Sequence, residues 1–476
     1  MRYTVFLASL ALLFIFPQHA GLAEPPLGAF MNPKTQADYV IITPKAYLPT
    51  LEPLAAFRTT HNGFSVLAIT TEEIYAAFGE GMPSDSAIRE FVTFALVTWE
   101  DPNPQFFLLA GNVNSVPSHK EPGVEFIGED SIMVDQWFVE GVVDSSGIIL
   151  PSAAIGRFPG WDSTQLAAMV AKTIAYESMS DSTWFDRSIA VADHEPGSNI
   201  FESQANACAE IISDLWTDTT TVHVLETSPS YLSREEFRGL INQGTALILT
   251  IGHHEWFAFS HSHYFTTWDV DSLDNSERLP FWIINESQRF EREDTLAMAV
   301  NLLQTTDKGA VGSMGPTGHT FLVEHFGFLA ALLNEMVANP GTPIGSVLLN
   351  VKQVPMRRAY RIVALLADPA LEIRTTVTTG MDNDPPVLPI VVTLKQNYPN
   401  PFNPTTTFEF SIPTSLFANL SVYNLLGENV VTVIDEQLAA GTHRVHWDAT
   451  GQPSGVYFYR LRAGGFTETK KLVLLR

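Results

Sequence analysis

Ala246-Leu247-Ile248-Leu249-Thr250-Ile251-Gly252-His253 is the stretch that decides the fold of this chain. Its first six residues are almost entirely apolar, which is typical of a strand that is buried on both faces of a parallel sheet. Gly252 and His253 follow at once, so a polar side chain stands where the strand ends. The stretch therefore predicts a parallel sheet that is covered on both faces, with a candidate functional side chain, His253, at the carboxyl end of one of its strands.

Runs of the same kind recur before and after this stretch. Helical patterns separate them, for example over 163–176 and 202–216. Apolar runs that alternate with helices predict an α/β fold, with a mainly parallel sheet covered by helices. We expect two such units, over 38–180 and 181–374. The other predicted strands are 39–42, 65–69, 106–110, 188–192, 221–225, 280–284 and 309–312.

The character of the chain changes near residue 375. Residues 375–392 are rich in Thr, Gly, Asp and Pro, which predicts a linker. Residues 393–476 then show short alternating strands with Gly and Pro turns, such as 406–411 and 456–461. This spacing predicts a small all-β sandwich of the immunoglobulin-like kind.

The composition limits the classes of partner. The chain has 476 residues, 45% of them hydrophobic, and a formal net charge of −25. A chain this acidic should repel nucleic acids and anionic lipid surfaces. Its single cysteine, Cys208, excludes an intramolecular disulfide. The pattern around Cys208 predicts a helix, with a buried thiol of unperturbed acidity.

The first residues predict a secretory signal peptide over 1–23. Arg2 gives a short basic region, and 5–16 is an apolar run too short to span a bilayer. Gly21 and Ala23 suit the small-residue rule for cleavage. Since no other run is long and apolar enough to cross a membrane, we expect the mature protein to leave the cytoplasm without a transmembrane segment.

The last 84 residues resemble the type A sorting domain of the type IX secretion system. The match opens with Leu394-Lys395-Gln396-Asn397-Tyr398-Pro399-Asn400-Pro401-Phe402-Asn403-Pro404 and closes with Lys470-Lys471-Leu472-Val473-Leu474. The resemblance implies recognition of 393–476 by an outer-membrane translocon and a sortase-like peptidase. It also implies delivery through the periplasm to the cell surface or medium of a Gram-negative bacterium.

Residues 24–374 resemble the catalytic domain of gingipain-type cysteine peptidases, whose fold is related to that of caspases. Segments that carry the resemblance include Phe107 to Pro117, Ile155-Gly156-Arg157-Phe158-Pro159, Gly252-His253, and Ala367-Asp368-Pro369-Ala370-Leu371. The family Asp of the first segment is Asn112 here. By the same resemblance, His253 stands at the position of the general base.

The residue expected to attack is missing. After the predicted strand 280–284, the family has Cys-x-x-Gly, but this chain has Asn285 at the Cys position and Gln288 at the Gly position. The thiolate is the nucleophile of a cysteine peptidase, and an amide cannot replace it. The first hypothesis is therefore a degenerate peptidase that binds or scaffolds a protein or peptide ligand.

An active hydrolase is the alternative. Ser287 lies two positions after Asn285 and would need activation by His253. A metal site is the other route, because imidazoles and carboxylates suit zinc. The spacing of these residues matches no established signature, and no calcium loop occurs, so we expect no cofactor and leave zinc or calcium open. The candidate metal ligands are His253, His254, Glu255, His261 and His263.

Overall fold

The structure is a computed structural model of the whole chain. It describes residues 29–123, 131–143, 149–179, 184–224, 228, 230–260, 262–284, 297–318, 322–353, 358–376, 393–412, 416–425, 427–438, 441–463 and 466–475. The predicted signal peptide and most of the predicted linker lie outside these residues. No helix in the described residues is long and apolar enough to cross a bilayer.

The first sheet has the strand order β2-β1-β3-β8, and its neighbouring strands are parallel. Its strands are β1 (Tyr39–Thr43), β2 (Val66–Thr70), β3 (Phe106–Ala110) and β8 (Ala154–Phe158). Helices α2 (Thr71–Phe78) and α3 (Asp85–Thr98) pack on one face, while α1 (Leu48–His61) and α4 (Ser163–Ser178) pack on the other. Both faces are therefore covered, as the continuous apolar runs predict.

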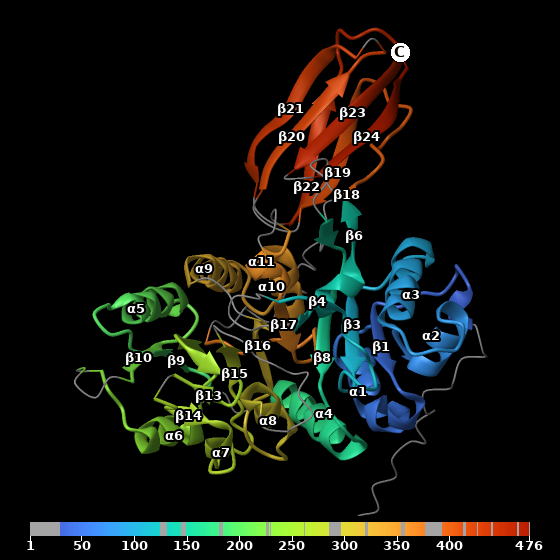
Figure 1. Cartoon of the computed structure of the whole chain (residues 1–476). Coiled ribbons are helices and arrows are strands. Elements are labelled where there is room, and N and C mark those ends of the chain that lie inside the picture. The colour runs from blue at the N-terminus through green and yellow to red at the C-terminus, as the bar shows by residue number, and fades with distance from the viewer. Residues whose placement is uncertain are drawn as a thin grey trace, which may run out of the picture.

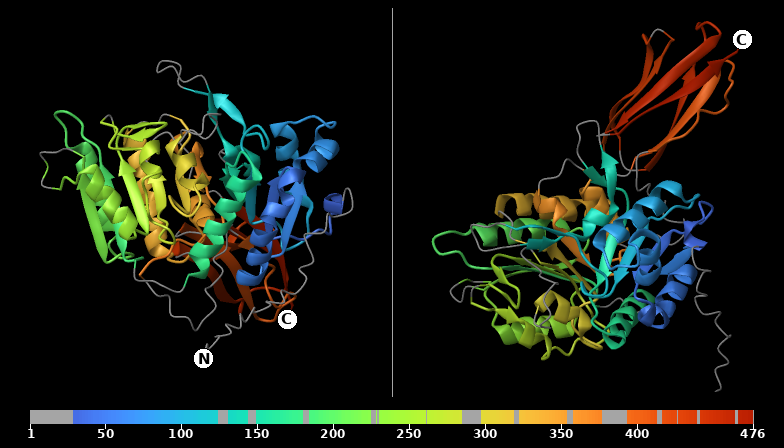
Figure 2. Two further views of the ribbon diagram at one scale, coloured as in Figure 1. Left: turned by 90° about the horizontal axis from the view of Figure 1, so that it is seen from below. Right: turned by 45° about the vertical axis from the view of Figure 1, so that its right-hand side comes forward.

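The second sheet has the order β10-β9-β11-β15-β16-β17, and only the β16–β17 pair is antiparallel. Its strands are β9 (Arg187–Ala192), β10 (Asp218–His223), β11 (Leu247–Ile251), β15 (Phe281–Ile284), β16 (Gly312–Pro316) and β17 (Val363–Leu366). One face is covered by α5 (Ile200–Ile212), α9 (Leu322–Ala338) and α10 (Ile344–Val351). The other is covered by α6 (Arg234–Gln243) and α8 (Met298–Gln304). Figures 1 and 2 show the two sheets side by side with these helices around them.

Short elements connect these layers. They include a three-stranded sheet that directly follows β11, in the order β12-β13-β14. The short strands are β4 (Lys120–Pro122), β5 (Ser131–Met133), β6 (Glu140–Val143), β7 (Ile149–Pro151), β12 (His254–Glu255), β13 (Ala258–Phe259) and β14 (Phe265–Thr266). The short helices are η1 (Ala29–Met31), η2 (Lys45–Tyr47), η4 (Asp135–Val139), α7 (Thr267–Val270) and α11 (Arg358–Arg361).

A buried ionic cluster joins the two units. Arg58 on α1 is fully buried, and its guanidinium lies 3.0 Å from Asp368 and 2.7 Å from Glu177. Tyr39 on β1 donates to the other carboxylate oxygen of Asp368 at 2.8 Å. Removing one partner would leave a buried charge uncompensated, so this cluster constrains how the units sit together. The Ala-Asp-Pro-Ala-Leu segment therefore has a structural role.

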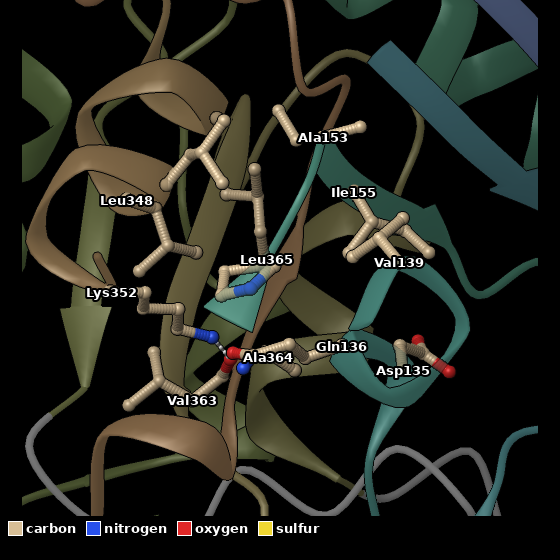
Figure 3. A pocket seen from close by; sticks show the side chains of 15 residues that line it. Asp135, Gln136, Val139, Ala153, Ile155, Leu348, Lys352, Val363, Ala364 and Leu365 are labelled. Atoms are coloured by element: carbon tan, nitrogen blue, oxygen red, sulfur yellow. Dashed lines mark hydrogen bonds between the residues drawn. The ribbon is translucent and has the colours of Figure 1, made fainter. Parts of the chain in front are cut away.

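The strands that meet between the two units pack closely. A Cβ atom on Gly156 of β8 would lie 2.3 Å from the carbonyl oxygen of Ala367, so the position requires glycine. Figure 3 shows the neighbouring cavity, where buried Lys352 donates to the Val363 carbonyl at 2.6 Å. The cavity volume is about 20 Å³, room for a single water molecule. This junction is thus a packed core and does not offer a ligand pocket.

The C-terminal residues form two antiparallel sheets, in the orders β18-β19-β22 and β21-β20-β23-β24. Phe408 and Phe410 from one sheet share a core with Leu420 and Tyr459 from the other. The predicted α/β fold with a C-terminal all-β module is therefore confirmed. The strands are β18 (Thr393–Leu394), β19 (Thr405–Ile412), β20 (Leu416–Tyr423), β21 (Asn429–Leu438), β22 (Gly441–Asp448), β23 (Gly455–Ala463) and β24 (Phe466–Leu474).

One predicted strand is wrong in its position. Residues 309–312 were expected to form a strand, but β16 begins only at Gly312. Gly309 has a φ of +91°, and Ala310 donates its N–H to the Leu302 carbonyl at the end of α8. Residues 309 and 310 therefore lie in the connection between α8, which ends at Gln304, and β16, and the positive φ of Gly309 is readily adopted by glycine.

Candidate active site at the carboxyl ends of three strands

Strands β9, β11 and β15 are consecutive and parallel in the second sheet. Ala192 pairs with Ile251, and Thr250 pairs with Ile284, so the three strands end at about the same level. Residues that follow the ends of neighbouring parallel strands lie at one edge of the sheet, where α/β proteins place their ligand sites. This edge brings together the segments that begin at Asp193 and at Gly252, beside the end of β15 at Ile284.

Gly252 brings the first two segments into direct contact. Its φ is +140°, and a Cβ built on it would lie 2.1 Å from the Cβ of Asp193. The Asp193 N–H donates to the Ile251 carbonyl at 2.8 Å, which extends the β9–β11 pairing by one residue. Only glycine fits at position 252, between the segments that follow β9 and β11.

His253 lies between two carboxylates. Its Nδ1 is 2.8 Å from Asp193 Oδ2, which also accepts the His253 backbone N–H at 3.1 Å. Its Nε2 is 3.3 Å from Glu195 Oε2. The Asp193 side chain is only 3% exposed, compared with 27% for His253 and 42% for Glu195. The ring of Phe201 meets the imidazole edge-on, with 5.0 Å between ring centroids.

The predicted nucleophile position lies outside the described residues. Residues 285–296 are not described, so the structure does not place Asn285, Ser287 or Gln288. The last described residue of β15 is Ile284, beside the strand that carries His253. The roles assigned to these three residues therefore stay predictions.

The candidate metal ligands fall into separate environments. His254 is buried, with Nδ1 3.0 Å from the Gly252 carbonyl and Nε2 2.9 Å from the Thr250 hydroxyl. Glu255 and His263 form a partly exposed pair with 3.6 Å between Oε1 and Nε2. His261 is outside the described residues. Within the described residues, no group of three or more His, Cys, Asp or Glu side chains is placed to hold a metal ion.

Cys208 lies on α5 and is fully buried, as predicted. The prediction of unperturbed acidity was wrong, because burial raises the pKa of its thiol to about 12. A thiol with this pKa carries almost no thiolate at neutral pH. Cys208 is therefore a core residue.

Two further family positions have structural roles. Asn112, at the family Asp position, accepts the backbone N–H groups of Asn114 and Ser115 at 2.9 and 3.0 Å. Arg157 is fully buried and makes a two-pronged pair with Asp135, at 2.7 and 2.8 Å. These contacts hold the turn after β3 and the helix η4, and neither involves His253.

Sequence reasoning missed Asp193 and Glu195. Asp193 directly follows the predicted strand 188–192, so a carboxylate at a strand end was a visible signal. The strand order that places it beside His253, 60 residues later, was not visible. Only the pairing of β9 with β11 brings the two residues together.

Residues 32–374 match the family model described as peptidase family C25. The chain belongs to peptidase family C25. Residues 396–475 match the model described as a secretion system C-terminal sorting domain. This C25 member therefore carries the type IX sorting module, is exported to the cell surface or extracellular space, and engages the secretion machinery through its tail.

Solved structures share the fold. The complex of the Porphyromonas gingivalis RgpB pro- and mature domains is 18% identical, with a TM-score of 0.60, over 92% of this chain and 100% of that chain. The Arg-specific cysteine proteinase gingipain R gives 17% identity and a TM-score of 0.61, over 95% and 100%. A further protease structure gives 12% and 0.58, over 93% and 98%. No match is found among curated proteins.

We expect Gly252→Ala to destabilise the fold strongly. The new methyl group meets the Asp193 Cβ, and the positive φ adds backbone strain of about 1–3 kcal/mol. Thermal or urea unfolding of the purified chain measures the loss. Gly63→Ala is the control, since Gly63 has a φ of +74° with nothing within 4 Å of its added Cβ. Equal losses in the two variants would contradict a steric role for Gly252.

Proposed function

We propose that this exported family C25 protein is a degenerate peptidase that acts outside the cell as a binding or scaffold module for a protein or peptide. The main support for this proposal is that His253 lies between two carboxylates, with Asp193 at Nδ1 and Glu195 at Nε2. The replacement of the family Cys by Asn285 points the same way.

The double pairing is unsuited to general base catalysis. A base must turn one nitrogen lone pair toward the nucleophile it deprotonates. Nδ1 of His253 faces Asp193 at 2.8 Å, so Nε2 is the nitrogen that a general base would turn toward its nucleophile. Glu195 Oε2 lies 3.3 Å from this Nε2 and occupies that side of the ring. His253 and its two carboxylate neighbours then help to shape the site.

A group of aromatic side chains on the segment that follows His253 supports a binding role. Trp256, Phe257 and Trp268 follow His253 along the chain, and their rings meet edge-on at centroid distances of 5.0 and 5.5 Å. Trp268 is 58% exposed. Exposed aromatic side chains with few rotatable bonds are frequent anchors in protein interfaces.

The peptidase test uses the purified chain and a panel of short amide substrates, with and without a metal chelator. We expect no hydrolysis above the uncatalysed rate in either condition. Hydrolysis that a chelator abolishes would favour the predicted metal site. Hydrolysis that Ser287→Ala abolishes would favour the serine route.

The binding test uses an array of unmodified peptides probed with the same protein. We expect Trp268→Ala to lower the affinity for the peptides that bind most tightly by about tenfold, since truncating an interface anchor costs roughly 1–2 kcal/mol or more of binding free energy. Val97→Ala is the matched control, because Val97 is 77% exposed on α3 of the first unit. If the wild-type chain binds no peptide, or if both variants bind like wild type, the binding role is wrong.

A further inference from the structure

The sorting module has one sheet face that the shared core does not use. On β20, Ala418, Leu420 and Val422 point into the core, so Phe417, Asn419, Ser421 and Tyr423 lie on the opposite face. On β23, Tyr457, Tyr459 and Leu461 are in the core, so Phe458, Arg460 and Arg462 face outward. We call this surface of β21, β20, β23 and β24 the outer face (Figure 1).

The strand register gathers cations and aromatic rings on the outer face. Arg462 pairs with Asn419, Arg460 pairs with Ser421, and Phe458 pairs with both Tyr423 and Lys471. The Arg460 guanidinium lies 5.1 Å from the Tyr423 ring centroid, and its Nε donates to the Thr469 hydroxyl at 3.0 Å. Arg460 is therefore held across the sheet.

A hollow of about 600 Å³ lies on this face. Exposed Phe417 and half-buried Tyr423 stand at the two ends of its β20 wall, with Arg462 on the neighbouring strand. Phe417 is 56% exposed. The hollow is lined by Phe417, Asn419, Ser421, Tyr423, Asn429, Thr432 and Arg462.

The outer-face cations have no carboxylate partner within the described residues. No ion pair there includes Arg460, Arg462 or Lys471. The facing carboxylate Asp435 accepts from Asn419 at 2.8 Å. The other sheet differs, because Lys395 and Arg444 both pair with Glu409, at 2.9 and 2.7 Å.

The charge of the chain is also uneven. Residues 393–476 contain seven Lys and Arg against six Asp and Glu, whereas residues 1–392 contain 20 against 46. A positive face with aromatic rings on a nearly neutral module, within an acidic protein, is complementary to an acidic partner. Arg binds carboxylates through two parallel hydrogen bonds, and exposed aromatic rings provide apolar anchors.

We propose that the outer face is the surface by which the secretion machinery holds the sorting module, through an acidic protein segment that enters the hollow. The proposal rests on the sorting assignment and does not depend on the peptidase site. A protein is favoured over a lipid surface because lipid recognition usually takes a cluster of four to eight basic residues. The outer face supplies three.

The test follows export of the full chain in a host that has the type IX system. The variant R460Q/R462Q is compared with K395Q/R444Q, which removes the same charge from the other sheet. Truncating one partner of a charge pair that an interface buries leaves the other charge unpaired, so we expect the outer-face variant to lose about tenfold or more of its surface and medium fraction. The control should lose less than about twofold, and the missing protein should accumulate in the periplasm.

Thermal unfolding of the purified full chains shows whether folding explains a loss. R462Q/K471Q gives a second variant, since none of the described side-chain contacts involves either side chain. Wild-type export of both outer-face variants, or equal loss in the control, would overturn the proposal. So would binding of the wild-type chain to anionic phospholipid vesicles that R460Q/R462Q abolishes, because that result identifies a lipid as the ligand.

Discussion

Asn285→Cys together with Gln288→Gly is expected to convert the proposed degenerate peptidase into a measurable peptidase. The first change restores a thiol at the family nucleophile position, and the second removes a side chain where the family has glycine. Losing one oxyanion donor costs roughly a hundred- to a thousandfold in rate. Asn285→Cys alone should therefore restore little activity. The measurement is hydrolysis of a panel of short amide substrates by wild type, both single variants and the double variant.

The pairing of His253 predicts how the rate can rise further. Glu195 Oε2 lies 3.3 Å from Nε2, so adding Glu195→Ala to the double variant should remove this neighbour and leave that nitrogen open to the new thiol. Asp193→Asn should act in the opposite direction, because Asp193 orients the ring through Nδ1 at 2.8 Å. In another triad, the same kind of change lowers the rate by about 10⁴.

Two controls separate this chemistry from other sources of activity. Adding His253→Ala should abolish the restored activity, whereas Ser287→Ala should leave it unchanged. If wild type cleaves as fast as the double variant, the proposed loss of function is wrong. A double variant that stays inactive while it folds normally would show that more than the nucleophile and the glycine has been lost.

Many strands of the two parallel sheets could be predicted from the sequence, because a buried parallel strand usually corresponds to a short run of consecutive apolar residues. Residues 106–110 form β3 with the predicted bounds, and 188–192 lie within β9. The run at 309–312 misled because small apolar residues suit both a strand and the connection that leads into one. Gly309 has a positive φ, which does not fit an extended strand and which the sequence pattern alone does not specify.

The candidate site could be predicted only in part, because its geometry depends on strand order. His253 was identified from the resemblance and from its place after a strand. Its partners come from another strand and became visible only with the β9–β11 pairing. The cluster 253–263 shows that closeness in sequence does not by itself place side chains together. Among its described residues, His254 is buried and hydrogen-bonded, whereas Glu255 and His263 form a separate pair at the surface, and the metal site stays a prediction.

Retention of the fold and the proposed loss of the nucleophile are separable in this chain. The buried pairs of Arg58 with Asp368 and of Arg157 with Asp135 occupy two of the segments that resemble the family. Both pairs are buried, so losing one partner would remove compensation from a buried charge. None of these residues makes a described contact with His253. These buried ion pairs stabilise the fold. A degenerate peptidase still needs that fold if it is to present a binding surface.

Deletion of residues 393–476 is expected to trap the protein in the periplasm. Residues 396–475 are the part that matches the sorting family, so the truncated chain lacks the module that engages the secretion machinery. The measurement is fractionation of a host with the type IX system, followed by immunodetection in periplasm, surface and medium. We expect nearly all of the truncated chain in the periplasm and nearly all of the full chain outside it.

The trapped chain should still be folded. The hydrophobic clusters of the α/β part contain no described residue after 373, and the cluster of the sandwich begins at Leu394. Removing the sandwich therefore exposes no described core side chain of the α/β part, and its unfolding temperature should change little. The full chain with His253→Ala is the control, because export should not depend on the peptidase-like site. Delivery of the truncated chain to the surface at the full-length level would refute the sorting role of the tail.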